Sequence, residues 1–232
     1  MEFHRFGDED DPPLLFVLGW GNRPEHAPVR WLIDHLAEDY RVHTATLPPH
    51  VTDVTREWVR PVERYAADLD DPAVLAHSAG GLTVAHADID ARTTTFLSPW
   101  WGDPPARQGP LIDLLAKIPG DLRFLPSGIE DRDLLGVHAT DQQLADGPDR
   151  VAPSFLRATR EAHRTLPAID DDAVVFCSLS DRVVSTRAVG DRVPTERLVC
   201  YDGGHELFSS RSRTDHLETL RSVIAEGPAG LD

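Results

Sequence analysis

Short apolar runs alternate with amphipathic segments along most of the chain. Each apolar run is only a few residues long, as a buried β-strand is, whereas the amphipathic segments repeat their apolar positions at helical spacing. Strands are expected at residues 14–18, 41–47, 73–76, 93–97, 173–177 and 197–201, with residues 2–6 as the candidate for one more. Helices are expected at residues 29–38, 55–69, 79–87, 111–118, 155–165, 185–189 and 214–225.

This alternation predicts an α/β fold, in which a mostly parallel sheet carries helices on both of its faces. Pro61 lies inside the segment 55–69, so that helix is either kinked at the proline or begins close to it. The rhythm breaks between about residues 100 and 170, where Pro and Gly interrupt several short helical patterns. We interpret the chain as one domain, residues 1–232, with residues 100–170 inserted as a helical cap over the edge where the parallel strands end.

Acidic residues outnumber basic ones by 39 to 23, which gives a formal net charge of −16. A surface of this charge repels nucleic acid and anionic lipid, so we expect neither a nucleic-acid nor a membrane partner. The acidic clusters lack the spacing of a calcium loop and the histidines lack a zinc-binding pair, so no metal is expected. The composition resembles that of salt-adapted cytoplasmic proteins. The chain shows no secretory-signal pattern, so a cytoplasmic location is expected.

The segment 74–81, Val-Leu-Ala-His-Ser-Ala-Gly-Gly, carries the strongest chemical signal in the chain. It predicts a buried strand, a sharp turn at Ser78 and a helix that begins with small residues. Such a turn places a serine hydroxyl at a helix N-terminus, where the helix dipole favours developing negative charge. The segment resembles the G-x-S-x-G nucleophile elbow of the α/β-hydrolases, with Ala76 where the first Gly is usual.

A second segment, Leu-Gly-Trp-Gly at residues 18–21, resembles the His-Gly-x-Gly oxyanion loop of the same family. The resemblance implies that the backbone N–H groups of Trp20 and Ala79 bind the oxyanion. Trp100 and Trp101 follow the next expected strand. They either line a substrate pocket together with Trp20 or anchor the cap to the sheet.

Two later segments resemble the loops that carry the other members of a catalytic triad. Residues 177–184 resemble the G-x-x-D-x-x-V loop of the triad acid, here Asp181, and Tyr-Asp-Gly-Gly-His at 201–205 resembles the loop of the catalytic histidine, here His205. Ser78, Asp181 and His205 follow the order of the family, each just beyond an expected strand. Asp103 follows the preceding strand and is the alternative acid.

The resemblance implies a serine hydrolase that cleaves a small or medium uncharged ester through a Ser-His-Asp triad and an acyl-enzyme, without a metal or an organic cofactor. The expected partner is therefore a small-molecule substrate. Thioester, amide, lactone and carbon–carbon cleavage use the same machinery and stay open, as does the oligomeric state. Two alternatives remain on the same fold: a non-catalytic binding protein and a cofactor-free haloperoxidase-like enzyme.

Overall fold

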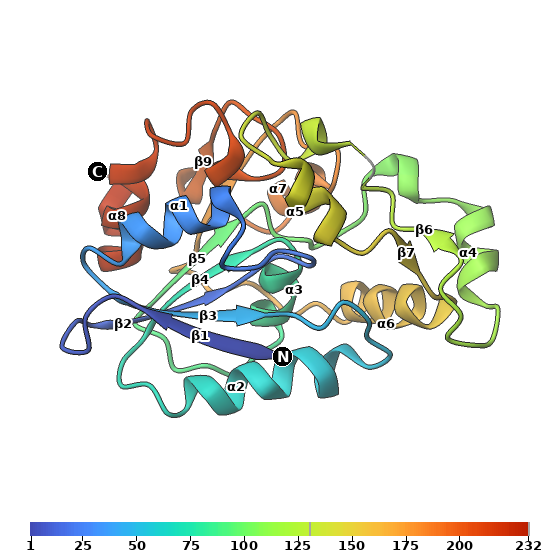
Figure 1. Cartoon of the computed structure of the whole chain (residues 1–232), viewed down its shortest axis with the longest axis horizontal. Helices are drawn as coiled ribbons and strands as arrows, with labels where there is room; N and C mark the ends of the chain where they lie inside the picture. Colours follow the sequence, from blue (N-terminus) through green and yellow to red (C-terminus); the bar gives the residue numbers. More distant parts are fainter. Residues whose placement is uncertain (130, 232) are drawn as a thin grey trace.

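The computed structural model describes residues 1–129 and 131–231, so Glu130 of the expected cap and Asp232, the last residue of the expected domain, lie outside the described residues. The described residues form a seven-stranded sheet in the order β1-β3-β2-β4-β5-β8-β9 (Figure 1). The strands are β1 (Glu2–Phe6), β2 (Pro13–Val17), β3 (Arg41–Thr46), β4 (Ala73–His77), β5 (Thr93–Leu97), β8 (Val174–Cys177) and β9 (Leu198–Cys200). Neighbouring strands run parallel except at the edge, where β1 pairs antiparallel with β3. The expected mostly parallel sheet is confirmed.

Helices cover both faces of the sheet (Figure 1). The main ones are α1 (Ala27–Leu36), α2 (Arg60–Ala66), α3 (Ala79–Ala85), α7 (Thr186–Gly190) and α8 (Leu217–Glu226). Leu14 and Phe16 of β2 share one apolar core with α1 and α8, whereas Leu15 and Val17 share the opposite core with α2 and α3. Because alternate side chains point to opposite faces, a strand that is covered on both sides appears in the sequence as a continuous apolar run.

Pro61 lies inside a continuous helical segment. Residues Thr55–Val59 form a π-helical turn, and α2 starts immediately after it, with Pro61 in its first turn. Val59 and Arg60 both have helical backbone angles, so the proline is not at a free helix end. The wider π-helical turn before it is where the helix departs from regular α-helical geometry, as a proline inside a helix requires. The two expected arrangements for residues 55–69 are therefore combined: α2 begins next to the proline, and the irregular turn precedes it.

The segment between β5 and β8 extends beyond the ends at which the parallel strands finish (Figure 1). It comprises the 3-10 turn η2 (Pro105–Arg107), α4 (Pro110–Ala116), β6 (Leu125–Pro126), the 3-10 turn η3 (Arg132–Leu134), α5 (Asp141–Asp146), β7 (Arg150–Val151) and α6 (Pro153–Arg164). The short strands β6 and β7 pair antiparallel as a separate ribbon. We call this segment the cap. In the two described ranges, no helix has the length and apolarity needed to cross a membrane.

Candidate active site

Ser78 lies on a sharp turn between β4 and α3. Its backbone has φ 53° and ψ −116°, a conformation that costs a non-glycine residue of the order of 1–3 kcal/mol. Main-chain bonds from Ser78 N to Leu97 O (3.0 Å) and from Trp100 N to Ser78 O (2.9 Å) hold the turn in place. Gly80 approaches β2 so closely that a Cβ atom there would lie 2.2 Å from the carbonyl oxygen of Val17. The small residues after Ser78 are therefore needed to bring the helix under the serine.

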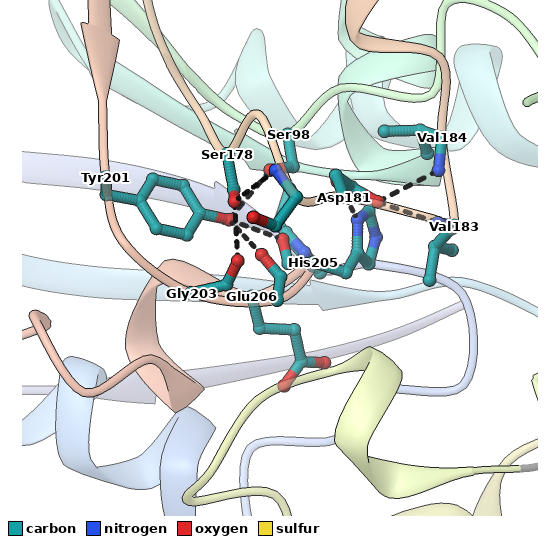
Figure 2. A network of polar contacts seen from close by, with 12 residues as sticks. Ser98, Ser178, Asp181, Val183, Val184, Tyr201, Gly203, His205 and Glu206 are labelled. Carbon is teal, nitrogen blue, oxygen red and sulfur yellow. Dashed lines mark hydrogen bonds and ion pairs between the residues drawn. The ribbon is translucent and has the colours of Figure 1, made fainter.

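His205 and Asp181 form a buried pair in the loops that follow β9 and β8. His205 Nδ1 lies 2.7 Å from Asp181 Oδ2, and both side chains are almost fully buried (Figure 2). The other carboxylate oxygen accepts from the backbone N–H groups of Val183 (2.7 Å) and Val184 (3.1 Å). Burial by itself would raise the pKa of Asp181, but the His205 ring and these N–H donors outweigh it and hold that pKa below its usual value. The pair is therefore built for a charged aspartate.

The loop that carries His205 is held from two sides. Tyr201 donates its hydroxyl to the carbonyl oxygens of His205 (2.7 Å) and Gly204 (3.1 Å), and Ser178 donates to the carbonyl of Gly203 (Figure 2). Burial raises the pKa of Tyr201 well above its ordinary 10.0, so the phenol stays a neutral donor. This bracing fixes the main chain on both sides of the imidazole.

Ser78 and His205 line one cavity of about 800 Å³, which opens between the sheet edge and the cap. Trp20 and Ala79 line it as well, so the structure brings the expected nucleophile, base and oxyanion donors together. Among the described residues, no hydrogen bond joins the Ser78 hydroxyl to the His205 ring. The geometric support for a catalytic site is therefore the Asp181–His205 contact, together with the cavity that Ser78 and His205 share.

The expected oxyanion loop is a tight turn. Asn22 N bonds to Gly19 O (3.0 Å), and Gly21 adopts φ +86°, which suits a glycine at the third position of a turn. A Cβ atom on Gly19 would lie 2.4 Å from Nδ1 of His77, so only glycine fits beside the elbow. The Trp20 side chain donates to Pro49 O (2.9 Å) and stacks on Phe155 of the cap, with the ring centroids 4.9 Å apart.

The two consecutive tryptophans have different places. Trp100 lines the cavity and stacks beside Phe155, whereas Trp101 is 1% exposed, packs edge-on against Phe96 and donates to Gly81 O. Trp101 therefore lies outside the cavity and anchors the start of the cap to the sheet. Asp103, the alternative acid, lies at the cavity wall and accepts from Trp100 Nε1 (2.9 Å).

A second buried polar cluster, which no sequence motif indicates, lies beside the site. It consists of Asn22, His77, Gln143, Ser209 and Glu206, the residue directly after the expected base. Complete burial holds the pKa of His77 well below its ordinary 6.5; the electrostatic effect of the neighbouring His205 lowers that pKa further, and a backbone hydrogen bond of His205 partly opposes it. In the part of the chain that the structure describes, no group of three or more His, Cys, Asp or Glu side chains is placed to hold a metal ion.

Comparisons with known proteins bear on the fold. No protein-family model matches the chain, and no curated protein sequence matches it. Among many solved structures that match the chain, three examples resemble it over most of their length. They are a protein from the study of the metagenome-derived lipolytic enzymes LipS and LipT (16% identity, TM-score 0.68, 97% of each chain), a soluble variant of monoglyceride lipase from Saccharomyces cerevisiae (15%, 0.68, 99% of this chain and 91% of that one), and an α/β-hydrolase fold protein from Burkholderia ambifaria (18%, 0.58, 92% and 90%). The chain therefore has the α/β-hydrolase fold.

Proposed function

We propose that this protein is a serine hydrolase that cleaves carboxylic esters, with Ser78 as nucleophile, His205 as base and Asp181 as the acid of the triad. The observation that carries the proposal is the buried Asp181–His205 contact of 2.7 Å, in one cavity with a serine on a strained elbow. A nucleophile and its base are often out of hydrogen-bond distance before substrate binds, so the missing Ser78–His205 bond is compatible with this assignment.

The mechanism follows from the order of these side chains. His205 takes the proton of Ser78 while Oγ attacks the ester carbonyl, and Asp181 stabilises the resulting imidazolium and holds its tautomer. The backbone N–H groups of Trp20 and Ala79 bind the oxyanion. His205 then gives the proton to the leaving alcohol, and an acyl-enzyme is left. Water, deprotonated by the same histidine, cleaves that acyl-enzyme to a carboxylic acid and restores Ser78.

The cavity supports a small or medium uncharged ester as substrate. Its volume of about 800 Å³ lies within the range of small-molecule sites. Trp20, Trp100 and Phe155 form an aromatic wall beside the serine, which suits an acyl chain or an aromatic group. Similarity to a lipolytic enzyme and to a monoglyceride lipase favours ester chemistry over the other reactions that this machinery performs.

The test uses Ser78→Ala, with Ser222→Ala on the exposed side of α8 as the matched control. The wild type and Ser222→Ala should hydrolyse p-nitrophenyl esters and take up a fluorophosphonate probe, because each keeps the nucleophile. Ser78→Ala should do neither while it keeps the far-ultraviolet circular dichroism of the wild type. A wild type that neither labels nor turns over esters of any chain length would mark the protein as a binding protein on this fold.

A further inference from the structure

A buried carboxylate lies directly beside the proposed base and has no role in the mechanism above. Glu206 follows His205 in the chain and is 1% exposed. Its side chain turns away from the Asp181–His205 pair (Figure 2). None of the ion pairs formed by the described residues includes Glu206, so neutral donors alone compensate for its burial. Because a buried carboxyl group without hydrogen-bond donors is costly, the loss of any one of these donors should destabilise this position.

The donors to Glu206 come from three different parts of the site. Asn22, at the end of the oxyanion turn, donates Nδ2 to Oε1 at 3.0 Å. Gln143, on cap helix α5, donates Nε2 at 2.9 Å to both carboxylate oxygens. Ser209, in the 3-10 turn that follows His205, donates Oγ at 2.5 Å. Glu206 thus joins the oxyanion turn, the cap and the histidine loop at one point.

Gln143 also contacts the oxyanion turn directly. Its Nε2 donates to Oδ1 of Asn22 at 2.9 Å, so that the Asn22 amide uses both its oxygen and its nitrogen within the cluster. The His77 ring lies 3.3 Å from the same amide nitrogen. Because the turn from Gly19 to Asn22 carries the proposed oxyanion donor of Trp20, the position of that N–H depends on how the Asn22 side chain is held.

The part of the cap from η3 to α5 contacts the site at several points. The backbone N–H groups of His205 and Glu206 donate to Leu134 O and Leu135 O, both at 2.9 Å. At the other end of α5, Asp146 lies 3.3 Å from the buried ring of His26. The segment from η3 to α5 therefore serves as part of the scaffold of the catalytic loops and is more than a cover over the substrate.

We propose that Gln143 is a positioning residue that couples cap helix α5 to the oxyanion turn through Glu206 and Asn22. The inference rests on the proposed ester hydrolysis. Its consequence is that the cap is needed even for esters too small to reach α5, because the Trp20 N–H moves when the cluster is broken. Displacement of a catalytic group by about 1 Å costs on the order of 100-fold in rate.

The experiment compares Gln143→Met with Gln142→Ala, which alters the exposed neighbour on the same helix. Met has nearly the length of Gln but neither donates nor accepts as its amide does. On p-nitrophenyl acetate, Gln143→Met should lower kcat roughly 10- to 100-fold with KM changed less than about 3-fold, because the transition state loses its oxyanion geometry. Gln142→Ala should match the wild type. A normal kcat on acetate, with KM raised only for long acyl chains, would overturn the proposal and make Gln143 a substrate contact.

A double-mutant cycle identifies the route of the coupling. If Gln143 acts through Asn22, the variant with both Asn22→Ala and Gln143→Met should be no slower on acetate than the slower single variant, whereas multiplying losses would contradict the route. If Gln143→Met does not fold, Gln143→Asn takes its place, since an amide one methylene shorter should also lower kcat and an unchanged kcat would overturn the proposal.

Failure of the proposed function would look different, because the wild type itself would then neither turn over ester nor label at Ser78. In that case the unfolding free energies of the wild type, the two single variants and the double variant are measured in urea. Non-additive losses of unfolding free energy would support the coupling of α5 to the oxyanion turn, and additive losses would overturn it.

Discussion

At the scale of single residues, the two candidate acids differ in what holds them. Asp181 is fixed by two backbone N–H donors on one oxygen and by His205 on the other. The Asp103 carboxylate accepts from the indole of Trp100, and its backbone carbonyl accepts from Gln108. One aspartate is therefore aimed at the imidazole, while the other braces the aromatic wall.

The first prediction compares Asp181→Asn with Asp103→Asn. An asparagine at 181 would present an amide to His205 Nδ1 and leave the imidazole in the wrong tautomer, which costs a serine protease about 10⁴-fold in turnover. We expect a kcat loss on the order of 10³ to 10⁴ for Asp181→Asn and a far smaller loss for Asp103→Asn, measured on one chromogenic ester. The reverse ranking would assign the acid to Asp103.

A second residue-scale prediction concerns His77, whose pKa is held well below 6.5 by burial. The unfolded chain takes up this proton below about pH 6.5, whereas the folded chain does not until the pH is much lower. The contribution of His77 to the unfolding free energy is therefore fully present above pH 6.5, and it is lost as the pH falls from 6.5 towards the folded pKa. His77 contributes up to about 1.4 kcal/mol per pH unit to this slope.

His77→Phe keeps an aromatic ring against Phe208 but removes the titrating group. Urea unfolding between pH 7.5 and 5.5 (chosen to bracket about 6.5) should show a shallower loss of stability in His77→Phe than in the wild type. His4→Asn, at an exposed position on β1, is the control for removing a histidine as such. Identical slopes in the wild type and His77→Phe would show that His77 does not carry the pH dependence.

Sequence motifs revealed those site residues whose immediate neighbours in the chain form a recognisable motif. Ser78, Asp181 and His205 each follow a strand within a short motif, and their catalytic roles stay predictions. Glu206 and Gln143 have no such local pattern, because they meet across 63 positions of chain. One signal was present in the sequence: an acidic residue, Glu206, directly precedes two large apolar residues, Leu207 and Phe208.

At the scale of elements, apolar periodicity located the strands and the longer helices to within a few residues. Differences at the ends have local causes: α1 begins two residues early because Pro28 suits the first turn of a helix. The short helix α5 escaped a separate prediction because Gln143, a polar residue, is its one fully buried position. An apolar pattern cannot reveal a helix that packs through hydrogen bonds.

The close approach of α3 to β2 predicts a sharp difference between two Gly→Ala variants. At Gly80 the added methyl would lie 2.2 Å from Val17 O, whereas at Gly190 on α7 it would meet nothing within 4 Å. We expect Gly80→Ala to lower the unfolding free energy by about 1–3 kcal/mol or more through overpacking. Gly190→Ala should be neutral or stabilising by up to about 1 kcal/mol. Equal melting temperatures of the two variants would contradict this close approach of α3 to β2.

At the scale of the whole molecule, charge is the dominant feature. The acidic clusters at residues 8–11, 68–71 and 170–172 lie mainly at exposed positions, and only some of their carboxylates pair with arginine, as Asp71 does with Arg92 and Asp171 with Arg197. With a net charge of −16, the folded state carries more mutual repulsion than the expanded chain. Screening by salt should relieve this repulsion.

The expected result is a melting temperature that falls on transfer from molar to dilute potassium chloride, where the screening length grows from about 3 Å at 1 M to about 10 Å at 0.1 M. Differential scanning calorimetry should compare melting temperatures in potassium chloride and in sucrose of equal osmolarity. Sucrose is excluded from the protein surface but does not screen charge, so a stabilisation seen only in the salt is due to screening. A melting temperature that stays constant or rises in dilute salt would remove the proposed salt adaptation.

The position of the cap in the chain also has a kinetic consequence. β5 and β8 are neighbours in the sheet, yet the whole cap lies between them in sequence, so their pairing must close a long loop. Closing this loop costs chain entropy, and that cost comes before the stabilising contacts between β5 and β8 have formed. The strands from β1 to β5, together with the turn at Ser78, can form without that step. During refolding we therefore expect the half of the molecule with the nucleophile to order first, and the loops of Asp181 and His205 to join it later.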